Sequence, residues 1–284
     1  EFIIGHLKSN ESVKRIIKLK IPDKSITGTR QFSLSFSNEC GKIIGNTTSQ
    51  VEIKSKERPI LAFTYKTQNV GNTSNKTGVK ESEKKIKIIL GVKNTGIGDS
   101  IDTVAVIKNV NGKGIFIDNG RVTLGKIKKD EVKEGEFTFK VLKDYAKEKI
   151  DFVLTIADLE LEYFFTKNIS ISIPKSQDVK DGNESAFYFP PLFQKLNNKC
   201  ILDRYENNCT IEGSAISENG LKDIMLFVGE NKTMYLRANK EESKKNLLDF
   251  KEVIELKNED DANVLLIARD QNDVTSSYSF YIAK

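Results

Sequence analysis

Three cysteines are the residues whose chemistry is easiest to read from this sequence. Cys200 and Cys209 flank the segment ILDRYENN. Their positions are symmetric about Arg204 and Tyr205, so a hairpin there would place them opposite each other on two antiparallel strands. The spacing allows a disulfide, and two buried free thiols are the other interpretation, so both stay open at this point. Cys40 is left over, and we expect it to be a small core residue.

The other reactive residue types do not form a catalytic set. His6 is the single histidine of the sequence, so a Ser-His-Asp triad or a Cys-His pair has no candidate base. Zinc needs clustered cysteine and histidine ligands, and that spacing is absent. Lysines are too numerous for one to stand out as the base of a Ser-Lys dyad. We therefore predict that this chain is not an enzyme and binds no cofactor.

Calcium is harder to dismiss, because oxygen ligands at alternating positions of a loop can hold it. The segment ARDQNDV supplies Asp270, Asn272 and Asp273, and the segment DVKDGNES, residues 178–185, supplies further carboxylates. Neither segment has the full EF-hand pattern. The competing interpretation is that these side chains cap turns, as Asp and Asn often do.

Four aromatic residues lie close together around a Pro-Pro pair. They are Phe187, Tyr188, Phe189 and Phe193. They form a candidate docking patch for a protein partner. The alternative is that they pack against a neighbouring domain, because monomeric proteins rarely expose large apolar patches.

The elements that would position these residues are β-strands. Apolar and polar residues alternate with period two in IKIILGV (86–92), EFTFKVL (136–142), DFVLTIA (151–157) and NISISIP (168–174). This alternation is typical of strands with one face in a core and the other in water. Turn residues that tolerate positive φ separate the strands, for example Asn94-Thr95-Gly96 and Asn119-Gly120. Gly91–Ile127 is thus predicted to be several antiparallel strands joined by tight turns.

Short strands at regular spacing predict an all-β protein of tandem Ig-like or fibronectin-like sandwiches. We divide the chain into residues 1–56, 57–174, 175–198 and 199–284. The first part has three predicted strands, VKRIIKLKI (13–21), RQFSLSFS (30–37) and SQVEIKS (49–55), and we interpret it as the end of an upstream domain. The second and fourth parts are sandwiches, and the third is a linker.

Charge and hydropathy limit the class of partner. The chain has 45 Lys and Arg against 40 Asp and Glu, a net charge of +5. These charges are interleaved along the sequence, whereas nucleic-acid binding would need clustered Lys and Arg. No run of about 18 apolar residues is present, so no membrane span is predicted. The chain begins with Glu and lacks a signal peptide, and we interpret it as a fragment or a processed piece.

Two segments resemble a known family in motif and order. In the first, Asn94, Gly96 and Gly98 form an N-x-G-x-G turn, followed by Gly112 to Phe116, Gly120, Arg121, Leu124 and Gly125. In the second, the matching residues are Asp223, Tyr235, Asn239, Asn263, Ala268, Arg269 and Asp270. Together they resemble the non-catalytic β-sandwich region that follows the protease domain in one bacterial group of tail-specific (carboxy-terminal processing, S41-type) serine peptidases. The resemblance covers roughly residues 57–284.

The resemblance implies an accessory role rather than catalysis. The family's Ser nucleophile and Lys base lie on an α/β domain preceded by a PDZ module, and no S-A-S-A-S-E-like segment occurs here. We therefore expect a region that positions a protease or docks proteins, for instance by β-augmentation at an edge strand, in an extracytoplasmic setting (periplasmic, cell-surface or secreted). The alternative is a structural or adhesive surface protein of tandem Ig-like modules.

Overall fold

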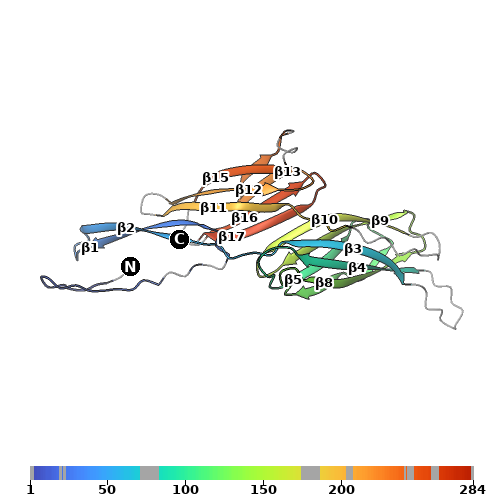
Figure 1. Ribbon diagram of the computed structural model, residues 1–284, viewed down its shortest axis with the longest axis horizontal. Helices are drawn as coiled ribbons and strands as arrows, with labels where there is room; N and C mark the ends of the chain where they lie inside the picture. The colour runs from blue at the N-terminus through green and yellow to red at the C-terminus, as the bar shows by residue number, and fades with distance from the viewer. Residues whose placement is uncertain are drawn as a thin grey trace.

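A computed structural model describes residues 3–18, 21, 24–70, 83–173, 186–202, 207–239, 241, 246–256 and 262–282 of the chain (Figure 1). All seventeen elements formed by these residues are β-strands. The predicted all-β class of tandem antiparallel sandwiches is therefore confirmed. The acidic segment 178–185 and the turn between the two paired cysteines lie outside the described residues.

The first sandwich, here called the β3–β10 sandwich, consists of two four-stranded layers that face each other. One layer has the order β3 (Leu61–Val70), β4 (Glu83–Asn94), β8 (Val132–Leu142) and β6 (Ile115–Asn119). The other has the order β10 (Tyr163–Ser172), β9 (Lys149–Asp158), β5 (Thr103–Asn109) and β7 (Arg121–Gly125). Alternate residues of β4 and β8 point into the core, as the period-two pattern predicts. Phe139 of one layer packs on Phe152 of the other, with ring centroids 4.9 Å apart.

The second sandwich, here called the β11–β17 sandwich, has a separate hydrophobic core. One layer has the order β15 (Leu247–Glu255), β12 (Asn207–Ile216), β11 (Leu192–Leu202), β1 (Gly28–Ser37) and β2 (Ile43–Ile53). The other has the order β14 (Asn231–Arg237), β13 (Leu221–Val228), β16 (Ala262–Asp270) and β17 (Thr275–Ile282).

The two sandwiches share a sheet. Strand β17 of the second pairs with β10 of the first through Phe165–Ser276 and Thr166–Thr275. These pairs join two four-stranded layers into one eight-stranded sheet that runs through both sandwiches. The backbone hydrogen bonds of a ladder fix the relative position of two strands, so this pairing limits rotation between the sandwiches.

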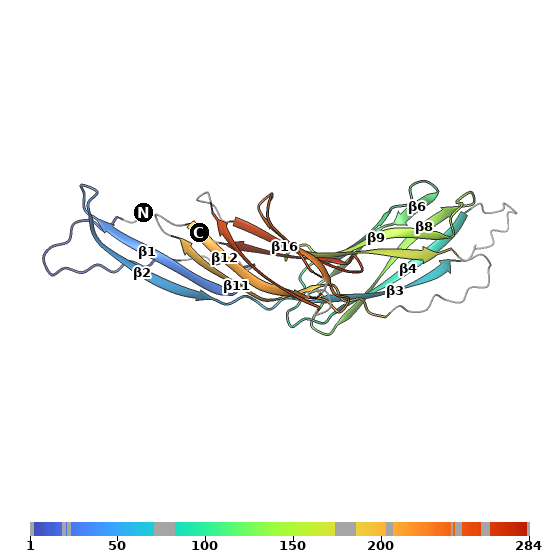
Figure 2. The same cartoon turned by 90° about the horizontal axis from the view of Figure 1, so that it is seen from above.

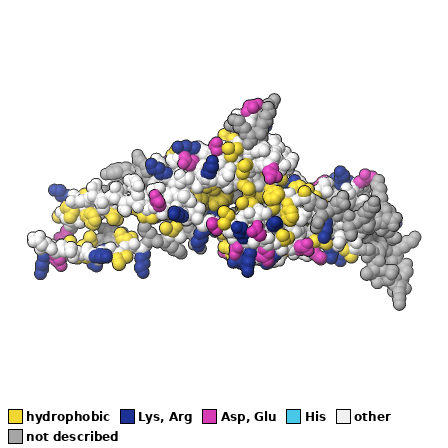
Figure 3. Space-filling model, in the orientation of Figure 1, with side chains coloured by type: hydrophobic (Ala, Val, Ile, Leu, Met, Phe, Trp, Pro, Cys, Tyr) yellow, Lys and Arg dark blue, Asp and Glu magenta, His cyan; other side chains and the backbone are white. Residues whose placement is uncertain are grey.

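The β1–β2 ribbon extends beyond the second sandwich. Strand β1 pairs with β11 only over Gly28–Phe32, and the rest of β1 pairs with β2 alone. Both views place this ribbon at the end of an elongated molecule opposite the β3–β10 sandwich (Figures 1 and 2). Apolar side chains are exposed near its tip, among them Leu34, Phe36 and Ile44. Figure 3 shows hydrophobic atoms along this end of the molecule.

The structure differs from the sequence predictions in the first 56 residues. Residues 13–18 form no strand, despite their alternating pattern, because an alternating pattern makes a strand only where another strand pairs with it. The β1–β2 ribbon joins the second sandwich through a parallel pairing with β11, so within this chain it is not a separate unit. Whether an upstream domain also uses it stays a prediction.

Two further differences concern connections. In Gly91–Ile127 the chain changes layers at each turn, since β5 and β7 pair with each other whereas β6 pairs with β8. The turns at Asn111-Gly112 and Asn119-Gly120 are therefore crossings between layers. Strand β11 begins at Leu192, so the end of the predicted linker 175–198 belongs to a sheet.

Candidate binding cleft

Cys200 and Cys209 are bonded in a disulfide, and they face each other in the register of β11 and β12. Both side chains are buried. Cys40 was expected in a core but is exposed, because it lies in the turn that joins the two strands of the projecting ribbon. Disulfides persist in oxidising compartments, so this bond weakly indicates such a location for the protein.

The proposed calcium ligands stabilise a turn between β16 and β17. Asp270 is buried, and its Oδ1 accepts hydrogen bonds from the backbone amides of Asn272 (2.9 Å) and Val274 (2.8 Å). The carboxylate of Asp273 pairs with Lys222 at 2.6 Å. Both carboxylates are thus used within the turn and its ion pair, and the described residues contain no group of three or more His, Cys, Asp or Glu side chains that could hold a metal ion.

The four aromatic residues of the predicted patch do not share one surface. Tyr188 pairs with Phe63 beside β3 and stacks on its ring at a centroid distance of 5.0 Å. Phe193 packs in the second core, 6.4 Å from Phe250. Phe187 and Phe189 alternate with Tyr188 and are each 39% exposed. The segment thus covers the β3 edge rather than forming a four-ring docking patch.

The N-x-G-x-G turn clamps the linker between β2 and β3. Asn94 is fully buried, and its Oδ1 accepts hydrogen bonds from the amides of Ile60 (3.2 Å) and Gly96 (3.0 Å). Its Nδ2 donates to the carbonyls of Gly98 (2.8 Å) and Ile127 (3.1 Å). One amide side chain therefore satisfies backbone groups of three segments that are distant in sequence.

Close backbone packing explains both glycines of that turn. A Cβ on Gly96 would lie 2.4 Å from the amide nitrogen of Ile60, and one on Gly98 would lie 2.2 Å from the carbonyl oxygen of Glu57. Only glycine lets the turn approach the linker so closely. The amide of Gly98 also donates to the carbonyl of Arg58 at 3.2 Å. The linker residues 57–60 are therefore held firmly against the first sandwich.

The clamp fixes Arg58 at the junction of the sandwiches. Its guanidinium lies over the ring of Tyr278, 4.1 Å from the centroid, and Nη2 donates to the carbonyl of Lys24 at 3.1 Å. Nη1 is buried without a hydrogen bond. Burial lowers the pKa of Arg58 from its ordinary value, and the nearby Tyr278, Asp158 and Glu162 oppose that shift. The arginine thus brings a positive charge to the junction, near the carboxylates of Asp158 and Glu162.

A second set of contacts joins the sandwiches beside Arg58. Glu162, at the turn before β10, pairs with Lys24 at 2.7 Å and accepts hydrogen bonds from Ser279 (3.0 Å) and Tyr281 (3.3 Å) of β17. Burial raises the pKa of Glu162, but the hydrogen bonds from Lys24, Ser279 and Tyr281 outweigh it and lower the pKa below its ordinary value. Ser277 of β17 adds another contact between the sandwiches, because its Oγ accepts a hydrogen bond from the backbone amide of Phe164 at 2.9 Å.

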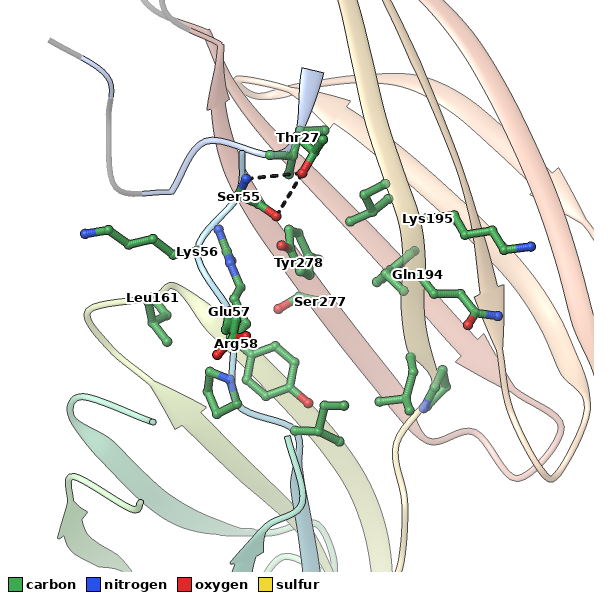
Figure 4. A pocket seen from close by; sticks show the side chains of 18 residues that line it. Thr27, Ser55, Lys56, Glu57, Arg58, Leu161, Gln194, Lys195, Ser277 and Tyr278 are labelled. Atoms are coloured by element: carbon green, nitrogen blue, oxygen red, sulfur yellow. Dashed lines mark hydrogen bonds between the residues drawn. The ribbon is translucent and has the colours of Figure 1, made fainter. Parts of the chain in front are cut away.

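A cavity of about 370 Å³ lies at this junction. Figure 4 shows Ser55 to Arg58 on one side, Gln194 and Lys195 of β11 on the other, and Ser277 and Tyr278 between them. Thr27 closes one end, where its Oγ1 contacts Ser55 Oγ at 3.1 Å. Apolar side chains line the remaining wall: Ile26, Pro59, Ile60, Leu161, Pro191, Leu192, Phe193 and Leu196.

Sequence reasoning missed this cleft. Arg58 lies in KERPIL, which indicates only the start of a unit, and Tyr278 lies in an ordinary alternating strand. Their contact joins residues 220 positions apart (278 minus 58), so no local spacing reveals it. The nearest signal is the N-x-G-x-G motif, whose two glycines indicate a close approach of backbone without saying to what.

Three residues of the second resembling segment, Asp223, Tyr235 and Arg269, form a structural cluster on strands β13, β14 and β16. Asp223 on β13 is buried, and both of its oxygens accept hydrogen bonds from Arg269 of β16, through Nε at 2.8 Å and through Nη2. Tyr235 of β14 donates to the same carboxylate at 3.2 Å. The hydrogen bonds that Arg269 donates to Asp223 raise the pKa of Arg269. This set links three neighbouring strands and lies apart from the cleft lining.

Comparisons with known proteins give no family. No protein-family model matches the chain, and no curated protein matches it. Among solved structures it is similar to red sea bream transglutaminase, at 12% identity and a TM-score of 0.26 over 81% of this chain and 32% of that one. It is also similar to dimeric latent PorU from Porphyromonas gingivalis, at 14% identity and a TM-score of 0.26 over 77% of this chain and 24% of that one. The chain therefore spans about a third or less of each.

Proposed function

We propose that this chain is a non-catalytic accessory region that holds protein partners in a fixed relative orientation. One observation carries the proposal: the sheet shared through β10 and β17 joins the two sandwiches into one elongated body. The clamp at Asn94 and the contacts of Glu162 support the same rigidity. A rigid body with exposed loops and edges suits positioning better than chemistry.

The parent of this region and its location are part of the proposal. We infer an extracytoplasmic setting, periplasmic, cell-surface or secreted, because a buried disulfide is stable in oxidising compartments. Membership of the tail-specific peptidase group stays a prediction based on the sequence motifs alone. The described residues contain no helix long and apolar enough to span a membrane.

A structural or adhesive surface protein is the second candidate, and the elongated shape supports it (Figures 1 and 2). We expect protein partners rather than nucleic acid in either case. On the face seen in Figure 3, Lys and Arg side chains are interspersed with Asp and Glu over both sandwiches. Nucleic-acid surfaces instead concentrate basic residues on one face.

Small-angle scattering and a hydrolysis assay test the proposal together. The scattering curve of the purified chain should fit a single elongated body in which the sandwiches keep one orientation. The same preparation should release no product from denatured casein or from p-nitrophenyl acetate. A curve that needs an ensemble of inter-sandwich angles would contradict the positioning role, and hydrolysis by the purified chain would contradict the absence of catalysis.

A further inference from the structure

Eight asparagines of the chain begin an Asn-x-Ser/Thr triplet, the acceptor motif of N-linked glycosylation. The chain has 23 asparagines and 38 serines and threonines, so chance would give about three such triplets rather than eight. This excess indicates that the triplets have a role of their own. Five of these asparagines, here called the motif asparagines, lie in the described part of the chain: Asn10, Asn46, Asn168, Asn208 and Asn231.

The motif asparagines differ from the other asparagines in how the fold uses them. All five are exposed, and within the described part of the chain none of their side chains forms a hydrogen bond. Thirteen other asparagines have described side chains, and ten of these are hydrogen-bonded through the side-chain amide. The ten are Asn38, Asn94, Asn109, Asn111, Asn119, Asn197, Asn198, Asn219, Asn239 and Asn263. The fold thus leaves free the amides that an acceptor motif requires.

The strand positions also direct the motif asparagines into solvent. Asn168 of β10 and Asn208 of β12 precede Ile169 and Cys209, which lie in the cores with 2% and 0% exposure. Because successive side chains of a strand point to opposite faces, both asparagines lie on the outer faces of their sheets. A glycan is added to a chain that has yet to fold, so the folded protein must accommodate it. An oligosaccharide at these positions displaces no packed side chain.

We propose that the five motif asparagines carry N-linked oligosaccharides. The donor is a lipid-linked oligosaccharide diphosphate, and an oligosaccharyltransferase of a secretory pathway transfers the glycan. The bond between C1 of the first N-acetylglucosamine and the diphosphate oxygen breaks, and C1 bonds to Nδ2 of the asparagine. The amide loses one proton, which leaves with the lipid diphosphate. This inference rests on the extracytoplasmic location in the proposed function, and it favours the cell-surface or secreted setting.

The glycan at Asn46 shields the edge of a sheet. Strand β2 forms one edge of the five-stranded sheet, has eleven residues and contains no proline (Figure 2). Glu52 is its only charged residue, whereas the opposite edge strand, β15, has four. Proteins protect such edges with charge, proline or short length, because the free backbone groups of an edge pair with other chains. A bulky, hydrated oligosaccharide at Asn46 supplies that protection on β2.

Mass spectrometry of the protein purified from the cells that produce it tests the assignment. Peptide-N-glycosidase F removes an N-linked glycan and converts its asparagine to aspartate, so treatment in heavy-oxygen water labels each occupied site. We expect the label at the motif asparagines, and unmodified asparagine at these positions would overturn the proposal. Cell fractionation tests the location separately. A secreted protein with empty sites would therefore contradict this inference and leave the proposed function standing.

Two substitutions of Thr48 test the shielding of β2. Thr48→Ala removes the motif and leaves Asn46 in place, whereas Thr48→Ser keeps the motif. Both change an exposed side chain, so the fold is expected to stay intact. In the whole chain secreted from cultured human cells, Thr48→Ala should strengthen self-association by about tenfold or more, measured by analytical ultracentrifugation. Thr48→Ser should behave as the wild type.

Asn168→Gln is the matched control for the loss of a glycan. Asn168 lies on β10, a central strand of the eight-stranded sheet, so losing its glycan uncovers no sheet edge. Self-association of this variant should stay within about twofold of the wild type. Equal self-association of Thr48→Ala and Thr48→Ser, or of Thr48→Ala and Asn168→Gln, would overturn the shielding of β2.

Discussion

At the scale of single residues, the buried side chain of Asn94 connects three segments of the chain. Four hydrogen bonds from one buried amide connect the turn, the linker and the strand end near Ile127. Removing the side chain leaves several backbone groups without partners in a buried place, where each costs about 1–3 kcal/mol. The residue thus determines where the wall of the cleft lies.

We therefore predict that Asn94→Ala lowers the free energy of unfolding by about 3 kcal/mol, measured by urea denaturation. The matched control is Asn119→Ala. That side chain makes one exposed hydrogen bond, to the carbonyl of Glu136 at 2.8 Å, and its loss should cost below about 1 kcal/mol. Equal effects of the two substitutions would show that the clamp does not stabilise the fold.

Gly96→Ala tests the close approach of the turn to the linker. The added methyl would lie 2.4 Å from the Ile60 nitrogen and 2.7 Å from the Arg58 carbonyl oxygen, both backbone atoms. The linker must move, and we expect a loss of about 2 kcal/mol. In Gly45→Ala the methyl meets only a ring atom of Phe36 at 3.8 Å, and stability should change by less than about 0.5 kcal/mol.

Glu162 makes the junction sensitive to pH. Its pKa is lowered in the folded state, so its contribution is present above the unfolded pKa of about 4.3 and is lost as the pH falls through the lower folded value. Between pH 6 and pH 3, the stability difference between the wild type and Glu162→Gln should shrink with falling pH. Urea midpoints measure this difference, and a difference that stays constant or grows would contradict the assignment.

Local chemistry could be predicted at this scale, whereas long-range contacts could not. The sequence correctly indicates a turn at Asn94-Thr95-Gly96, but the predicted reason is wrong, because none of the three residues has a positive φ. Glycine is needed at position 96 because a Cβ would meet the backbone of the linker. It does not indicate that Asn94 binds Ile60, since a buried amide has many candidate partners. The same limit applies to Arg58 and Tyr278, whose stacking depends on how the two sandwiches meet.

At the scale of elements, the β11–β12 pair is fixed by its disulfide. The cysteines are nine residues apart and buried, and closing such a short loop stabilises a fold by about 2–3 kcal/mol. Replacing both by alanine should lower the free energy of unfolding by about that amount. Cys40→Ser, at an exposed site, should have no effect. Identical thermal midpoints with and without dithiothreitol would contradict this.

The alternating patterns predicted most of the strands but not which strands pair with each other. The alternation of Ile86, Ile88, Leu90 and Val92 predicts one buried face, and all four are buried. The same kind of alternation in 13–21 predicts a strand that residues 13–18 do not form. A pattern reports only that one face is apolar, whereas a strand also needs a partner. The parallel pairing of β1 with β11, about 170 residues apart, carries no local signal.

At the scale of the whole molecule, the shared sheet is the feature on which the account depends. Two residue pairs between β10 and β17, with the contacts of Glu162 and Ser277, connect the two cores. Composition and periodicity predict two sandwiches but are silent on this connection. If this connection keeps the two sandwiches in one relative orientation, the cleft keeps its width and the elongated body can hold its partners at a fixed orientation.

Distances between spin labels on the two sandwiches, measured by electron paramagnetic resonance, test most directly whether the sandwiches keep one relative orientation. Spin labels are placed at Thr123→Cys on β7 and at Val253→Cys on β15, both exposed, with Cys40→Ser to remove the free thiol. A reference pair, Thr123→Cys with Val70→Cys, lies within the β3–β10 sandwich. We expect one distance between the sandwiches, with a distribution as narrow as that of the reference pair. A broad or multiple distribution would contradict the account.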